Sequence, residues 1–78
     1  MTNLICALFA VTYIGGETAH IPTKYQEKTV FTINKGVITE HIENTSIVYK
    51  KSEVIKMGKH IHIHKPTLTR KYYCKEIL

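Results

Sequence analysis

The segment KTVFTINKGVITEHIE, residues 28–43, indicates a β-hairpin. A two-residue turn at Lys35-Gly36 pairs Asn34 with Val37 and separates apolar from polar side chains, which favours this register. One face then carries Phe31, Ile33, Ile38 and Ile42, and the other carries Thr32, Asn34, Thr39 and His41. Because Lys-Gly is a weaker turn than Asn-Gly, a three-residue loop that includes Asn34 is the alternative.

The segment before this hairpin contains the most apolar run of the chain, LICALFAVTYIGG, residues 4–16. It lacks the basic start and the cleavage site of a signal peptide, and it is too short to span a bilayer. Apolar side chains occupy both of its faces, which predicts a central strand buried on both sides. The following stretch, residues 15–28, is expected to be a long loop with one short helical turn near Tyr25.

The segment after the hairpin also alternates. SIVYKKSEVIKM, residues 46–57, is expected to pair across a turn at Gly58 with KHIHIHK, residues 59–65. Pro66 ends that strand because it has no amide hydrogen to donate. LTRKYYCKEIL, residues 68–78, forms a last strand, so the sequence predicts an all-β fold, a five- or six-stranded antiparallel barrel or curved sheet.

The length of 78 residues fits one small β domain over residues 1–78. A chain of this size has a marginal core and often gains support from self-association, so a homo-oligomer is expected, with an exposed edge strand as one route. Cys6 and Cys74 lie near opposite ends of the chain and are interpreted as free, buried thiols in a reducing, cytoplasmic compartment. No cofactor is expected.

The positive charge is concentrated in the C-terminal part. Residues 50–78 hold eight Lys and Arg against two Glu, whereas residues 1–49 hold three Lys against four Glu. This asymmetry suggests an anionic partner, and the alternative is a basic face that serves only solubility. Tyrosines and alternating histidines lie in the same region, and cations beside aromatic rings suit single-stranded nucleic acid.

The sequence therefore predicts a non-enzymatic binding module for RNA, or less readily single-stranded DNA or another phosphorylated ligand. Its size and composition are similar to those of small accessory proteins of phages and mobile elements, although no motif carries that similarity. The alternative function is a small inhibitor or adaptor that binds an acidic surface of a host protein such as a toxin or defence enzyme. The candidate binding residues are Lys50, Lys51, Lys56, Lys59, His60, His62, His64, Lys65, Arg70, Lys71, Tyr72, Tyr73 and Lys75.

Three other functions have less support. His62 and His64 are close enough on one strand face to share a metal ion, but no further ligand stands at a recognised spacing. The chain has no aspartate, so catalysis is not expected, with metal-free RNA cleavage by His62 or His64 as the alternative. A membrane role is not expected, because the basic part contains no amphipathic helix.

Overall fold

A computed structural model describes residues 1–77 of the chain. These residues form eight β-strands and two short 3-10 turns, so the all-β prediction is confirmed and the expected five or six strands were too few. The strands are β1 (Thr2–Tyr13), β2 (Thr18–His20), β3 (Lys28–Asn34), β4 (Val37–Ile42), β5 (Thr45–Tyr49), β6 (Val54–Met57), β7 (His60–His64) and β8 (Leu68–Glu76), and the turns are η1 (Thr23–Tyr25) and η2 (Lys51–Glu53).

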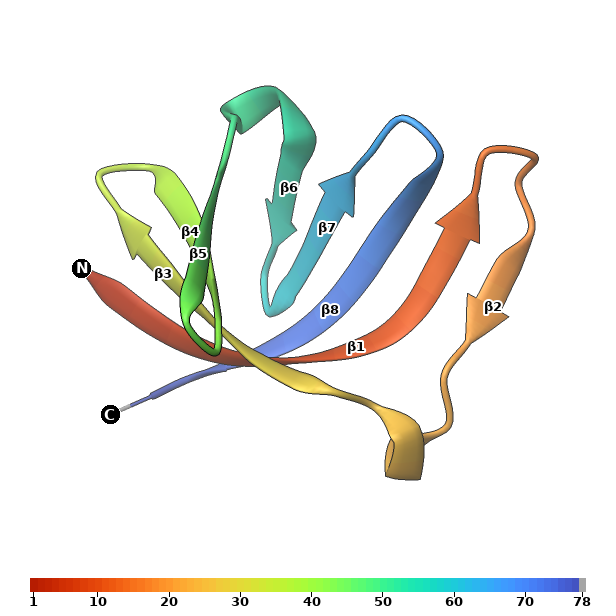
Figure 1. Cartoon of the computed structure of the whole chain (residues 1–78), viewed down its shortest axis with the longest axis horizontal. Coiled ribbons are helices and arrows are strands. Elements are labelled where there is room, and N and C mark those ends of the chain that lie inside the picture. Colours follow the sequence, from red (N-terminus) through yellow and green to blue (C-terminus); the bar gives the residue numbers. More distant parts are fainter. Residues whose placement is uncertain (78) are drawn as a thin grey trace.

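The strands form one antiparallel sheet in the order β5-β4-β3-β1-β8-β7-β6, and β2 pairs with the end of β1. The sheet curls into a half-barrel, with the long strands β1 and β8 at the base and the outer strands rising on either side (Figure 1). We call its concave side the inner face and its convex side the outer face. Among residues 1–77, β5 and β6 are the two ends of this order and have a strand partner on one side only.

The hairpin formed by β3 and β4 has the predicted register, with Asn34 opposite Val37. Lys35 and Gly36 both have positive φ, 52° and 79°. That combination belongs to a type I′ turn, whose twist matches the twist of the flanking strands. The pairing places Phe31 on the inner face, where it is fully buried.

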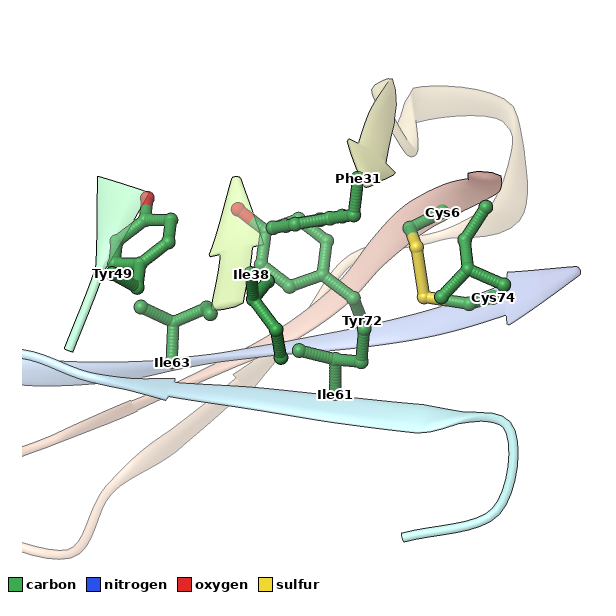
Figure 2. Close-up of a cluster of buried hydrophobic side chains, with 9 residues drawn as sticks. Cys6, Phe31, Ile38, Tyr49, Ile61, Ile63, Tyr72 and Cys74 are labelled. Carbon is green, nitrogen blue, oxygen red and sulfur yellow. A yellow bond between two sulfur atoms is a disulfide. The ribbon is translucent and has the colours of Figure 1, made fainter. Parts of the chain in front are cut away.

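The core lies on the inner face and joins the two sides of the half-barrel. Its buried side chains come from β1, β3, β4, β5, β7 and β8: Leu4, Cys6, Phe31, Ile38, Tyr49, Ile61, Ile63, Tyr72 and Cys74. Figure 2 shows these side chains meeting above the ribbons of β7 and β8. The two isoleucines of β7 point inward as alternation predicts, and both are fully buried.

The segment 46–57 is not the single strand that we expected. The chain turns once at Glu43-Asn44, so that β5 pairs with β4 on one side of the half-barrel. It then crosses through η2 to β6, which pairs with β7 on the other side. Residues 50–53, where the chain leaves β5 for β6, contain no glycine or proline, so the local sequence carried no strong signal for this break.

Two further expectations need correction. β1 is the central strand, as predicted, but it is not buried on both sides along its length: Leu4 and Cys6 on the inner face are buried, whereas Ile5 on the outer face is 38% exposed. The loop after β1 contains the predicted helical turn as η1, but it also contains the short strand β2.

The two cysteines form a disulfide and are not free thiols. Cys6 on β1 is the direct cross-strand partner of Cys74 on β8, with the two Cα atoms 4.0 Å apart. They are separated by 68 positions in the sequence, and the pairing of the first long strand with the last brings them together. The disulfide therefore lies at the base of the half-barrel, across the seam between its two sides (Figure 2).

Candidate nucleic-acid interface

The outer face of β7 and β8 brings together six of the predicted binding residues. His60, His62 and His64 on β7 stand directly opposite Tyr73, Lys71 and Thr69 on β8. Alternation along each strand sends all of these side chains to one side of the sheet. We call this surface the outer basic face, and its predicted members are His60, His62, His64, Lys71, Tyr73 and Lys75.

Aromatic rings line up across the outer basic face. The His60 ring contacts the Tyr73 ring edge-on with centroids 5.2 Å apart, and on its other side it contacts the Phe9 ring at 5.6 Å. The three rings come from β8, β7 and β1, and His60 connects Tyr73 to Phe9. Tyr73 is 41% exposed, which leaves part of its ring open to a stacking partner.

The charge on this face is not neutralised. Among residues 1–77, no glutamate lies on the outer side of β1, β6, β7 or β8, because Glu76 points to the inner face opposite Leu4. The pKa of His62 is lowered by partial burial, and then by the positive charges of Lys71, His60 and His64. An anion bound here would offset that repulsion.

The histidines do not form a metal centre within residues 1–77. No three His, Cys, Asp or Glu side chains in this part of the chain come together as a set of metal ligands. The His64 ring nitrogen Nδ1 is instead 3.0 Å from the Thr69 hydroxyl, and its Nε2 is buried without a hydrogen-bond partner among the described residues.

Four other predicted lysines lie in the turns that join the strands. Lys50 and Lys51 precede and begin η2, and Lys59 lies in the turn between β6 and β7. Lys65 follows β7, where its ammonium lies 3.7 Å from a Glu53 carboxylate oxygen and 4.7 Å from the centroid of the Tyr49 ring.

The remaining three predicted residues face inward. Lys56 is opposite Ile61 on the inner side of β6, and its ammonium donates to the Gly58 carbonyl. Arg70 donates to the Tyr49 hydroxyl. Tyr72 is only 3% exposed and packs edge-on against Phe31, so its ring is not open to a base and stacking would fall to Tyr73.

Sequence reasoning missed a buried polar cluster around Glu40, which is 2% exposed. The Tyr49 hydroxyl donates to Glu40 Oε1, and the Tyr72 hydroxyl donates to Oε2 at 3.5 Å. Burial and the neighbouring carboxylate raise the pKa of Tyr72 to about 12 and raise that of Tyr49 further. The available signal was alternation, because Glu40 falls between Ile38 and Ile42 on the apolar face.

Comparison of the chain with protein-family models, curated proteins and solved structures gives no match. No helix within residues 1–77 has the length and apolar character needed to cross a membrane.

Proposed function

We propose that the protein is a non-enzymatic module that binds single-stranded nucleic acid, RNA in preference to DNA, on the outer basic face. The observation that carries the proposal is the grouping of three histidines, two lysines and an exposed tyrosine on one side of β7 and β8, with no glutamate beside them in the described strands. Cations track the phosphate backbone and exposed rings stack on bases, and a curved sheet presents both on one surface.

Lys71, Lys75 and the turn residue Lys59 would position the phosphates, and Tyr73 would stack. The histidines would donate hydrogen bonds when neutral and pair with phosphate when charged. The His60 ring would support Tyr73, because it already contacts the Tyr73 ring and is itself in contact with the Phe9 ring.

Salt dependence and a matched pair of variants test the proposal. Affinity for a short single-stranded RNA should fall steeply between about 50 and 200 mM salt, because phosphate contacts release counterions. Tyr73→Ala should weaken binding by about 5- to 100-fold, the range that base stacking usually contributes. Tyr25→Ala is the control, because Tyr25 is also an exposed tyrosine, at 65%, but lies on η1. Affinity that is flat with salt, or equal losses in the two variants, would contradict the proposal.

The alternative function is an inhibitor or adaptor that binds an acidic surface of a host protein, and the same unneutralised charge favours it. Affinity purification from host extract distinguishes the two. A stoichiometric protein partner that survives nuclease treatment would support the alternative, whereas loss of all bound material after nuclease would support nucleic acid.

We also propose that the chain self-associates through the free edge of β6. Its outward side chains Ile55 and Met57 are 46% and 54% exposed, and an unpaired edge offers backbone groups to a second strand.

A cytoplasmic location stays a proposal, and the Cys6–Cys74 disulfide makes it testable, since disulfides persist mainly in oxidising compartments. Rapid alkylation of thiols in the host measures which state is present. Labelling of both cysteines would place the protein in a reducing compartment, and protection of both would place it in an oxidising one.

A further inference from the structure

A cleft of about 520 Å³ opens beside the buried cluster around Glu40, on the inner face of the half-barrel. Its lining includes Glu40, Arg70 and Tyr72 together with Glu27, Lys28 and Glu43. Small-molecule sites usually have volumes of about 300–1,000 Å³ and a few convergent polar groups on a largely apolar wall. We call this space the Glu40 cleft.

The polar groups at the bottom of the Glu40 cleft are incompletely satisfied. The hydrogen bond from Tyr72 to Glu40 Oε2 is long, at 3.5 Å, which leaves that oxygen able to accept another donor. Arg70 Nη2 donates to the Tyr49 hydroxyl at 3.3 Å, but Arg70 Nε is buried without a partner among residues 1–77. Buried donors are nearly always paired, so the Arg70 guanidinium keeps unused donor capacity beside the cleft.

The cleft combines both signs of charge. It contains three of the six acidic residues of the chain together with Lys28 and Arg70. A simple anion would be repelled by the carboxylates, and a simple cation would be repelled by the guanidinium. The matching ligand carries hydrogen-bond donors and acceptors side by side and has little net charge of its own in that part.

We propose that the Glu40 cleft binds one base of the nucleic acid and selects guanine. This proposal rests on the proposed function and adds base specificity to it. Arginine pairs in two-point fashion with O6 and N7 of guanine, and a carboxylate can accept from the N1–H and N2–H donors on the neighbouring edge. Uracil offers a single N–H between two carbonyl oxygens, which would face the Glu40 carboxylate with like partial charge.

The Glu40 cleft is connected to the outer face through Lys28. This residue also lines a smaller hollow on the outer face with Ile5, Ala7, Tyr73 and Lys75. Lys28 stands opposite Ala7 at the start of β3 and lines both hollows. A single-stranded nucleic acid with one base stacked on Tyr73 could therefore run past Lys28 and place another base in the Glu40 cleft.

Nuclear magnetic resonance of the ¹⁵N-labelled full chain tests the proposal with GMP and UMP as probes. The Nε–Hε signal of Arg70 reports on the cleft, and the backbone amide of Tyr73 reports on the outer basic face. GMP should shift the Arg70 signal and should bind roughly 5- to 150-fold tighter than UMP, the discrimination that one good bidentate base contact gives. Arg70→Lys should remove this preference, because lysine keeps the positive charge but lacks the two parallel N–H donors of the guanidinium.

Glu40→Gln is the second variant and should also reduce GMP affinity to that of UMP. Because Glu40 is buried, the folding of the Glu40→Gln variant is checked by thermal denaturation. If this variant does not fold, the result for Arg70→Lys decides the test. Glu17→Gln, in the turn between β1 and β2, is the matched control and should leave the preference for GMP unchanged.

The outcomes separate the two proposals. A short RNA that shifts Tyr73 while GMP leaves the Arg70 signal in place would overturn the guanine cleft and keep the proposed function. A GMP shift at Arg70 with no RNA effect at Tyr73 would overturn the proposed function and keep the cleft as a nucleotide site. Equal affinity for GMP and UMP in the unmodified protein would overturn the selection of guanine.

Discussion

At the residue scale, the Tyr49 hydroxyl links the two charged groups of the core. It donates to Glu40 and accepts from Arg70. Tyr49→Phe removes both contacts and leaves each charged group with one partner fewer. We expect a loss of about 1–3 kcal/mol in the free energy of unfolding, the cost of leaving buried polar groups unpaired. Urea denaturation measures it, and Tyr13→Phe, on a half-exposed tyrosine, should change the midpoint little.

His62 makes stability depend on pH. Its pKa in the folded protein lies below the usual value, chiefly because of burial and then because of Lys71. The unfolded state therefore binds the proton more readily. The contribution of neutral His62 to the free energy of unfolding is fully present above about pH 6.5, and it is lost as pH falls through the lower folded-state pKa. Thermal denaturation between about pH 7 and 5 should show this loss, and His62→Gln should reduce it. An unchanged pH profile in that variant would contradict the assignment to His62.

Bound nucleic acid should reverse this trend. Phosphates near Lys71 would raise the pKa of His62, so RNA affinity should increase as pH falls through the same range.

The buried cluster around Glu40 could be predicted only in part from the sequence. Its position on the inner face follows from alternation, but its two tyrosine donors come from β5 and β8, and their approach depends on how the whole sheet curls.

At the element scale, the turn between β3 and β4 can be improved. Both turn residues have positive φ, and asparagine tolerates the first position better than lysine does. Lys35→Asn should therefore stabilise the protein by about 0.5–2 kcal/mol. The urea midpoint measures this, and Lys24→Asn, in η1, is the control. A lower midpoint for Lys35→Asn would show that the side chain of Lys35 makes a contact of its own.

The disulfide fastens the two central strands. Replacing both cysteines, Cys6→Ala with Cys74→Ala, should lower the free energy of unfolding by about 2–5 kcal/mol, since the disulfide restricts the unfolded chain. A reducing agent should lower the urea midpoint of the unmodified protein to a similar extent and leave the double variant unaffected. A reductant effect in the double variant would assign the loss to something other than this bond.

Prediction from sequence succeeded for elements defined by local alternation and failed where distant segments meet. The β3–β4 register followed from sorting apolar from polar residues over residues 28–43. The disulfide did not, because spacing along the chain says nothing of the pairing of β1 with β8. The crossing between β5 and β6 was missed because residues 50–53, which make it, contain no glycine or proline.

At the scale of the whole molecule, the half-barrel leaves β5 and β6 with free edges. If β6 mediates the proposed self-association, the mass measured by analytical ultracentrifugation should rise with protein concentration. Ile55→Lys should keep the protein monomeric, because a lysine on an edge strand opposes pairing. Val37→Lys is the matched control, since Val37 is 44% exposed but lies at the start of β4. A monomer at all concentrations would contradict self-association.

The candidate site, like the fold, could be predicted only in part from the sequence. Alternation along residues 59–75 grouped the outer histidines, Lys71 and Tyr73, but it could not say which tyrosine is exposed. Tyr72 and Tyr73 are adjacent, and only the direction of curl decides that Tyr72 enters the core. The Glu40 cleft needed the complete fold, because its walls come from four segments that are far apart in the sequence.

The seam between β1 and β8 also has a mechanical consequence. The start of β1 and the end of β8 lie side by side as antiparallel strands (Figure 1), so a force that pulls residues 1 and 77 apart would unzip the hydrogen bonds one after another. Cys6 and Cys74 would stop this peeling within a few residues of each end. At about 3.3–3.6 Å per extended residue, the oxidised protein should lengthen by only about 30 Å, and everything between the two cysteines would be shielded from a pulling motor until the disulfide is reduced.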